Sequence, residues 1–389
     1  MLQKVLLTDT HWRTSYYVCK ALAKKGVKVI GLKTVDSIFD KSSHYSNIII
    51  VPSLETYPEE WLCKIQQIAS GDEILMPVSV EAIKFVASNK TRLSKILLIP
   101  PIPLEQIMLA LDKRESQKFI ESIGIPTPVT FYPMSLNDAE DALLETKFPV
   151  VLKLRQERNI PPRERYGIAY DIVEFRKLYR KLSVIQSPLL MQEYISGQGV
   201  GVSILADKGT VLAIFQHQRL REQFKTGGPS TFCSYFNSKV LEDYASMFAR
   251  KSEWSGIAML EFKYNHDKKT FYFMEINPRF WGSMELAIIS GVNFPYLFLE
   301  WILGNNRKNI VRQSKTIKLK YLNMDIEAFT ESIVGLDKKS RHKMFLSYMK
   351  EHLDKHLRYG HIDIRDWRVS GNESLSSVKS FGRMVKYVF

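Results

Sequence analysis

Long hydrophobic runs are missing from this sequence. No stretch reaches the roughly 18 uncharged apolar residues that indicate a transmembrane helix. The apolar stretch near the amino terminus is too short for the hydrophobic core of a signal peptide, and no small-residue cleavage site follows it. We therefore expect a chain without a transmembrane segment, located in the cytoplasm.

Cysteine is also scarce. The 389 residues include 3 cysteines, at positions 19, 63 and 233, and no two of them have the C-x-x-C spacing. A disulfide framework and a zinc site are therefore both without support. Cysteine usage of this kind fits a reducing compartment.

Two kinds of motif are absent. No G-x-G-x-x-G follows the first predicted strand, so a dinucleotide-binding site would lack its phosphate-binding loop. No Ser-His-Asp or Cys-His arrangement is readable either, which leaves hydrolase chemistry without support.

Basic residues are in excess, because 55 Lys and Arg against 41 Asp and Glu give a net charge of +14. A positive net charge allows two interpretations. The protein binds nucleic acid or an anionic membrane, or it is an enzyme that handles nucleotide phosphates and acidic substrates. The basic residues are spread along the chain, and no nucleic-acid-binding motif is present. We therefore expect no nucleic-acid partner. A non-catalytic basic module that binds nucleic acid or anionic lipid stays open as an alternative.

The first hundred residues alternate strands and helices. "KVLLTD" at 4–9 is typical of a buried strand, the stretch 12–26 of a helix, and "VKVIGLK" at 27–33 of a second strand. This β-α-β order predicts a parallel sheet. The proline-dense "LLIPPIPLEQ" predicts a domain boundary near residue 100.

Beyond that boundary, strands and helices continue to alternate. Apolar or alternating stretches predict strands at 148–157 and 210–222, and two strands joined by a short glycine-rich bend within 188–207. Helical patterns cover 104–124, 171–182, 239–256 and 282–291. In the last of these, Ser283 is expected to cap the start of the helix and Gly291 to end it.

A predicted hairpin carries oxygen-bearing side chains. "GIAMLEFKY" at 256–264 and "KKTFYFMEIN" at 268–277 flank a polar loop, and Glu261 and Glu275 are symmetric about it. We therefore expect these two glutamates close together on adjacent strands. Strict alternation places Glu275 and Asn277 on one face with Phe271 and Phe273, and Tyr272, Met274 and Ile276 on the other.

Two carboxylates this close repel each other unless a cation lies between them. Two glutamates and an asparagine oxygen are hard ligands that suit Mg²⁺ (or Mn²⁺), which can also take oxygens from a nucleotide phosphate. The alternative is a strand end whose polar groups face water or lysines. The register of Glu261 and the Pro-Arg that follows Asn277 favour the metal site.

The order and spacing of several motifs resemble the ATP-grasp superfamily, and more narrowly its carboxylate–amine ligase members related to the carbamoyl-phosphate synthase large subunit and D-aspartate ligase. The resemblance covers roughly residues 1–304. It rests on "LDKRESQKFIESIGIPTP", "FPVVLKL", "LLMQEYISGQG", "HQRLREQFKTGGPSTF", "AMLEF" and "FMEINPRFWGSMELAIISGVNFP".

This resemblance implies an α/β fold with a Rossmann-like, pre-ATP-grasp domain followed by two ATP-grasp lobes that clamp ATP. The domains would be 1–100 for the Rossmann-like part, 101–185 for the small lobe and 186–304 for the large lobe with the metal site. Residues 305–389 form a C-terminal extension. Its basic helical stretch is expected to pack on the sheet lobe, and a membrane-surface contact is the alternative.

The resemblance also implies roles for particular residues. Lys113 and Lys153 match the two phosphate-contacting lysines, and Glu193, Tyr194 and Ile195 match the hinge at the adenine edge. Glu261, Glu275 and Asn277 match the Mg²⁺ ligands, and Arg279 matches the arginine that steadies an acyl phosphate.

A second set of residues is predicted from their types and spacing. Arg219 and Arg221 alternate with their neighbours, so both are expected on one face of a strand, where two guanidinium groups favour an anion site. The loop "KTGGPST" at 225–231 offers backbone amides to an anion or substrate, with Gly227, Gly228 and Ser230 as the candidates. A loop without a ligand is the alternative.

Two features depart from the family pattern. The loop after Lys153 has four arginines, at 155, 158, 163 and 165, where relatives have Gly and Ser. Many relatives also have an acidic residue a few positions after the hinge, where it holds the ribose. The corresponding stretch here, "SGQGVG", has none, so no ribose contact is assigned.

The expected activity is therefore that of an ATP-dependent carboxylate–amine ligase, with Lys153, Arg219 and Arg279 as catalytic residues. An acyl phosphate would form, and an amine would displace phosphate to give an amide and ADP. The expected partners are ATP, an acid and an amine. A phosphotransferase of the same fold is the other alternative, and the sequence leaves open whether the chain is a homo-oligomer.

Overall fold

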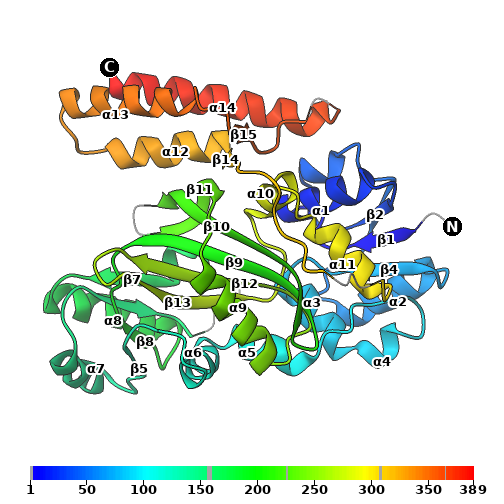
Figure 1. Cartoon of the computed structure of the whole chain (residues 1–389), viewed down its shortest axis with the longest axis horizontal. Helices are drawn as coiled ribbons and strands as arrows, with labels where there is room; N and C mark the ends of the chain where they lie inside the picture. The colour runs from blue at the N-terminus through cyan, green and yellow to red at the C-terminus, as the bar shows by residue number, and fades with distance from the viewer. Residues whose placement is uncertain (1–2, 156–159, 225–226, 306–308, 364) are drawn as a thin grey trace.

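The computed structural model describes residues 3–155, 160–224, 227–305, 309–363 and 365–389. Three sheets organise these residues, and helices lie between and around them (Figure 1). Within the described residues, no helix is long and apolar enough to cross a membrane.

The N-terminal sheet has 4 strands in the order β3-β2-β1-β4, all of them parallel. Its elements are β1 (Lys4–Leu7), α1 (Arg13–Ala23), β2 (Lys28–Lys33), η1 (Phe39–Lys41), β3 (Asn47–Ile50), α2 (Pro58–Ile68), β4 (Glu73–Met76), α3 (Val80–Ser88) and α4 (Lys90–Leu93). Val5, Leu6 and Leu7 of β1 are all buried, because helices cover both faces of a parallel sheet. The parallel arrangement is the one that the β-α-β order predicts.

The small sheet has 4 strands in the order β5-β8-β6-β7. It consists of β5 (Thr130–Phe131), β6 (Val150–Lys153), β7 (Tyr166–Ala169) and β8 (Leu190–Glu193), and its other elements are α7 (Leu136–Ala142), η2 (Leu143–Glu145), η3 (Pro162–Glu164) and α8 (Ile172–Ile185). Leu152 and Met191 of the sheet pack against Phe175 and Tyr179 of α8, and this cluster is separate from the other cores of the molecule.

The large sheet has 7 strands in the order β13-β12-β9-β10-β11-β14-β15. Its strands are β9 (Gln198–Asp207), β10 (Thr210–Phe224), β11 (Gly227–Tyr235), β12 (Gly256–Asn265), β13 (Thr270–Asn277), β14 (Lys318–Lys320) and β15 (Leu357–Tyr359). One face packs against α9 (Lys239–Lys251) through an apolar cluster that includes Leu260 and Phe248. A second cluster joins the large sheet, the N-terminal sheet and the C-terminal segment, with members such as Phe215, Tyr17 and Tyr321.

The helical stretch expected at 104–124 is divided in two. The helices are α5 (Leu104–Leu111) and α6 (Lys113–Ser122). Asp112 leaves the helical conformation, and its carboxylate accepts hydrogen bonds from the amides of Arg114 and Glu115. It thereby caps α6 and fixes Lys113 as the first helical residue.

The helix predicted at 282–291 is α10 (Met284–Ile289), and α11 (Phe294–Ile302) follows it. Gly291 has a φ of +106° just after α10, as a helix-ending glycine requires. Ser283 precedes α10, but its side chain makes no capping bond and instead lies 3.4 Å from Nε2 of His217. Ser283 therefore occupies the predicted N-cap position, but without the side-chain hydrogen bond that usually caps a helix.

The C-terminal segment extends the edge of the large sheet. β14 pairs antiparallel with β11, and β15 pairs parallel with β14. Helices α12 (Leu322–Ile333), α13 (Lys338–Glu351) and α14 (Trp367–Val388) lie together above that edge (Figure 1). The basic helix α13 packs inward through Tyr348, and most of its other side chains are exposed or half-buried.

A β-bulge interrupts the alternation of β13. Glu261 pairs with Glu275, whereas the next residue, Phe262, pairs with Phe273, so Met274 is an extra residue in β13. The prediction that Glu275 shares a face with Phe271 and Phe273 is therefore wrong. The two phenylalanines pack into the core beneath α9, while Met274, Glu275 and Asn277 all line the opposite face.

Candidate active site

A cavity of about 390 Å³ lies between the small sheet and the large sheet. Strands β6, β7 and β8 contribute one wall, and β10 to β13 contribute the other. The predicted site residues that line it are Lys113, Lys153, Glu193, Tyr194, Ile195, Arg219, Gly227, Gly228, Ser230, Glu261, Glu275, Asn277 and Arg279. Segments more than 160 residues apart in the sequence thus meet around one space.

The bulge in β13 positions the acidic centre of this cavity. Glu261 and Glu275 are direct cross-strand partners, and the Asn277 amide nitrogen lies 3.2 Å from a carboxylate oxygen of each. Two carboxylates and an amide are a suitable donor set for Mg²⁺ and leave coordination positions for phosphate oxygens and water. No cluster of three or more His, Cys, Asp or Glu that could hold a metal is found in the part of the chain that the structure describes.

The electrostatic surroundings of the two glutamates differ. Burial raises the pKa of Glu261, although Arg219 opposes this effect. Burial acts in the same direction on Glu275, but Lys113, the Asn277 side chain and Lys153 together hold the pKa of Glu275 below its usual value. The site therefore keeps a negative charge at Glu275, where a cation would bind.

Two lysines reach this centre from separate elements. Nζ of Lys113, at the start of α6, is 3.9 Å from a carboxylate oxygen of Glu275. Nζ of Lys153, at the end of β6, donates a hydrogen bond of 2.8 Å to Oε1 of Gln192. Both ammonium groups border the acidic centre, so they can contact an anion that a metal ion also holds.

The predicted hinge lies between β8 and β9. Glu193 ends β8 and approaches Lys268 at 3.5 Å, and Tyr194 and Ile195 follow it along the cavity wall. Gly197 has a φ of +140°, and a Cβ there would lie 2.0 Å from the backbone oxygen of Tyr264. Only glycine fits this approach, which holds the hinge against β12.

Arg219 is fastened by acidic and backbone groups inside the cavity. Its guanidinium bonds Glu261, donates to Glu222 at 2.9 Å, and donates to the Gly228 carbonyl oxygen at 3.1 Å. Glu222 is a site residue that the sequence analysis missed. A second bulge, at Leu220, places it on the cavity side together with Arg219.

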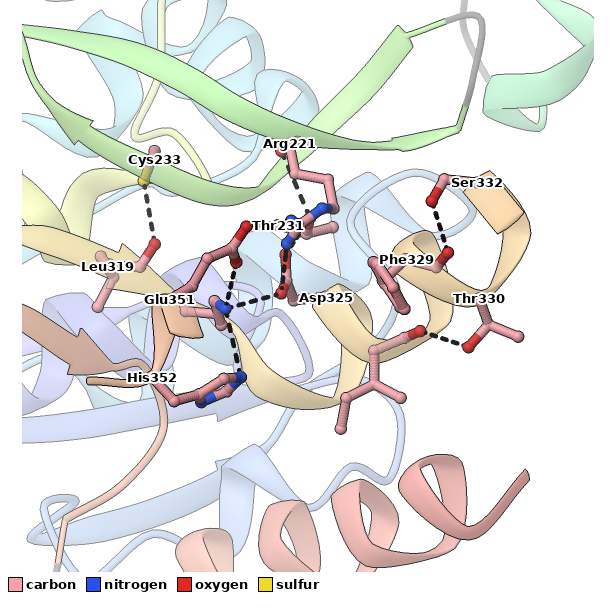
Figure 2. Close-up of polar contacts among 12 residues, drawn as sticks. Arg221, Thr231, Cys233, Leu319, Asp325, Phe329, Thr330, Ser332, Glu351 and His352 are labelled. Atoms are coloured by element: carbon pink, nitrogen blue, oxygen red, sulfur yellow. Dashed lines mark hydrogen bonds and ion pairs between the residues drawn. The ribbon is translucent and has the colours of Figure 1, made fainter. Parts of the chain in front are cut away.

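The same bulge overturns the expectation that Arg219 and Arg221 share a face. Arg219 pairs with Cys233 and Arg221 with the adjacent Phe232, which leaves Leu220 as the extra residue of β10. Arg221 does not line the cavity. It points the other way and donates to Asp325 of α12 and to Glu351 of α13, each at 2.8 Å (Figure 2).

The glycine segment begins a strand instead of forming a turn. Gly227 and Gly228, with φ of +130° and +109°, are the first residues of β11, and with Ser230 they border the cavity. Lys225 and Thr226 lie outside the described residues.

The arginine-rich loop brings one of its members to the cavity. Arg165 lines the wall, whereas Arg155 pairs with Asp112 at 2.5 Å. The guanidinium carbon of Arg163 lies 4.4 Å from the centre of the Phe224 ring. Arg158 lies outside the described residues.

Arg279 follows β13 and borders the same cavity. Its Nη1 donates to the backbone oxygen of Phe280 at 2.9 Å. Burial lowers the pKa of this guanidinium, although Glu275 and Glu261 oppose the effect.

The polar residue Gln192, which accepts the hydrogen bond of Lys153, was also missed by the sequence analysis. Its one signal was its place in an otherwise apolar strand beside the hinge.

Comparison with known proteins finds a family model and several relatives that match parts of this chain. Residues 186–324 match a family model described as "ATP-grasp in the biosynthetic pathway with Ter operon". The chain is 22% identical over 306 residues to the carbamoyl phosphate synthase large chain of Thermoanaerobacter pseudethanolicus, which covers 75% of this chain and 27% of that protein. It is 26% identical over 164 residues to the 3-methyl-D-ornithine--L-lysine ligase of Methanosarcina mazei, covering 40% of this chain and 37% of that protein. The chain thus spans about a quarter of the synthase and about a third of the ligase.

Among solved structures, the chain resembles an ADP complex of N5-carboxyaminoimidazole ribonucleotide synthetase. The TM-score is 0.66 at 14% identity, over 83% of this chain and 82% of the other. The chain therefore has the ATP-grasp fold. The resemblance to the ATP-grasp superfamily that the motifs predict is confirmed.

Proposed function

We propose that this protein is an ATP-dependent carboxylate–amine ligase that works through an acyl phosphate. The observation that carries the proposal is the convergence of Glu261, Glu275 and Asn277 with cationic side chains in one cavity of an ATP-grasp fold. Similarity to a protein named as an amino-acid ligase supports the choice of reaction. In this proposal, residues 1–100 form a Rossmann-like pre-ATP-grasp domain, 101–185 and 186–304 the two lobes, and 305–389 the C-terminal extension.

The nucleotide would lie between the two lobes. The adenine would meet the backbone of the hinge at Glu193, Tyr194 and Ile195, and the phosphates would extend towards Lys113 and Lys153. Glu261, Glu275 and Asn277 would hold Mg²⁺ (or Mn²⁺), which when bound neutralises part of the phosphate charge.

The chain's own residues then position the reacting groups. A carboxylate oxygen of the acid substrate attacks the γ-phosphorus, and the bond to ADP breaks. Lys153 and Arg279 stabilise the charge on the transferring group. The amine next attacks the acyl carbon, loses a proton and expels phosphate, which leaves an amide. Arg219 acts on this centre by holding Glu261 in place. Enclosure between the lobes keeps water from the acyl phosphate.

Glu275→Gln provides the test. With MgADP at 100 times its dissociation constant, the wild type should gain about 2.7 kcal/mol of stability, which is a shift of several degrees at most in the unfolding midpoint. In a separate screen of acid–amine pairs with MgATP, the wild type should also release ADP. Glu275→Gln should lose both effects and keep the midpoint of the free protein. Glu59→Gln, an equivalent change at an exposed ion pair with Arg92, is the matched control.

Two outcomes would change the proposal. If no nucleotide shifts the wild-type midpoint, the cavity is not a nucleotide site. If ADP release requires an acid but no amine, the protein is a phosphotransferase of the same fold.

A further inference from the structure

Arg13 lines the cavity and has no role in the reaction described above. Arg13, the first residue of α1, reaches the cavity wall from the N-terminal sheet. Its guanidinium carbon lies 4.4 Å from the centre of the Tyr321 ring, and its Nη1 contacts Sδ of Met324. Both partners belong to the C-terminal segment, so that segment holds the guanidinium of a residue near the N-terminus.

Arg13 is half-buried, and its charge is offset only in part, by an electrostatic interaction with Glu373 that is not an ion pair. A carboxylate is its usual partner in a protein interior, because an uncompensated buried charge is costly. Within the described residues, no carboxylate oxygen lies within 4.0 Å of the Arg13 guanidinium. An aromatic face and a thioether sulfur orient the group and leave its charge in place.

Arg13 borders the cavity beside the segment that follows Arg279. A Cβ on Gly282 would lie 3.2 Å from Nη2 of Arg13, so glycine gives the guanidinium its space. The hydroxyl of Tyr321 donates to the Gly282 carbonyl oxygen at 2.8 Å and ties this segment to the ring beneath Arg13. Ser283, the next residue, adds a hydroxyl to the same wall.

The charge of the cavity points in the same direction. Among the described residues, its lining contains seven lysines and arginines against four glutamates. In the proposed reaction, Lys113, Lys153 and Arg279 serve the phosphates, and Arg219 is compensated by Glu222 and Glu261. Arg165, next to β7, and Lys263 of β12 complete the set of cations, whereas Arg13 comes from α1, outside both sheets, and is available for a second anion.

We propose that Arg13, together with the Ser283 hydroxyl, forms a second anion subsite that binds a non-reacting carboxylate or phosphate group of a substrate. The planar guanidinium can hold two oxygens of such a group at once. This inference rests on the proposed ligase function, and it specifies that one substrate carries an anionic group besides the carboxylate that reacts. The C-terminal segment contributes to substrate selection by orienting Arg13.

Calorimetric titration of the full chain saturated with MgADP tests this subsite. The probes are glutarate, butyrate, which lacks the second carboxylate, and glycerol 3-phosphate. The wild type should bind glutarate at least tenfold more tightly than butyrate, and Arg13→Gln should reduce this ratio below threefold. Arg13→Lys, which keeps the charge without the planar fork, should give an intermediate ratio. Arg92→Gln removes a positive charge far from the cavity and should behave as the wild type.

Each outcome decides the point. Arg13-dependent binding of glycerol 3-phosphate without the glutarate effect identifies a phosphate as the anion and supports the subsite. The subsite would be overturned if each probe bound the wild type and Arg13→Gln with equal affinity. It would also be overturned if neither glutarate nor glycerol 3-phosphate bound the wild type. If Arg13→Gln does not fold, an unchanged ratio in Arg13→Lys overturns it as well.

The nucleotide arm separates this inference from the proposed function. All variants should bind MgADP within twofold of the wild type. Failure of the wild type to bind MgADP would count against the ligase proposal, and titration of the probes without nucleotide would still test Arg13. A purely structural role would lower the unfolding midpoint of Arg13→Gln without changing the ratio between glutarate and butyrate.

Discussion

Arg219 and Arg221 lie two residues apart on β10 and point to opposite faces of the large sheet. Arg219 holds Glu261 inside the cavity, and Arg221 holds Asp325 of the C-terminal segment. The extra residue at Leu220 produces this reversal. One strand therefore connects the acidic centre of the cavity to a buried ionic network on the other side of the sheet.

That network should stabilise the fold without touching the proposed nucleotide site. Asp325 is fully buried and pairs with Arg221 at 2.8 Å and with Lys320, also fully buried, at 3.4 Å. Asp325→Asn leaves Arg221 and Lys320 to share Glu351 as their remaining carboxylate partner, so we expect a loss of about 3 kcal/mol in the free energy of unfolding. Urea denaturation measures this loss. The affinity of the folded variant for MgADP should stay within twofold of the wild type.

Glu327→Gln, on the same helix, is the matched control for Asp325→Asn. Glu327 pairs with Arg383 at an exposed position, and its loss should change the stability by less than about 0.5 kcal/mol. Similar stabilities of Asp325→Asn and Glu327→Gln would show that the buried network contributes little.

The sequence was informative where local pattern determines structure. The parallel sheet, the helix of residues 239–251 and the pairing of Glu261 with Glu275 follow from alternation, polar loops and symmetry about a turn. The bulges at Met274 and Leu220 could not be predicted, because a single extra residue leaves the local amino-acid composition and the apolar pattern of a strand almost unchanged. Each nevertheless moves every later side chain to the other face.

The remaining gaps concern contacts between distant segments. Strands β14 and β15 have three residues each, too few for a periodic signal. They form because the edge of β11 accepts β14, and β14 in turn accepts β15. Arg13 and Gly282 are 269 positions apart in the sequence, and only the packed fold brings them into contact. Local patterns predicted the acidic centre, but not the arginine at the other side of the cavity.

Gly197 should be essential to the hinge. A Cβ would lie 2.0 Å from the backbone oxygen of Tyr264, and backbone cannot move aside as a flexible side chain can. Because the hinge ends two residues earlier, Gly197→Ala should displace Ile195 and weaken MgADP binding at least tenfold. It should also lower the free energy of unfolding by about 3 kcal/mol. Calorimetry and urea denaturation measure the two effects.

Gly124→Ala provides the comparison for Gly197→Ala. Gly124 also has a positive φ, of +80°, but a Cβ there meets nothing within 4 Å. Only the conformational strain of about 1–2 kcal/mol remains, and MgADP affinity should not change. If both variants weaken MgADP equally, the close contact with Tyr264 is not what holds the hinge.

His217 should make the stability depend on pH. Burial, with a smaller effect from Arg219, lowers the pKa of His217 to about 3. Its Nδ1 finds no hydrogen-bond partner within the described residues. In the unfolded chain the imidazole takes up a proton below about pH 6.5, whereas in the folded protein it stays neutral until about pH 3. The unfolded state thus binds more protons in this window, so the contribution of His217 to stability is lost progressively as the pH falls below about 6.5.

At pH 5 this imbalance amounts to about 2 kcal/mol. The free energy of unfolding of the wild type should therefore fall between pH 7 and pH 5 by about 2 kcal/mol more than that of His217→Gln. Urea denaturation at the two pH values measures the difference. His266→Gln, the same change at an exposed position, should keep the wild-type dependence. An identical fall in the wild type and His217→Gln would mean that His217 takes up its proton without unfolding, and that the cavity wall around Ser283 opens to accommodate the charge.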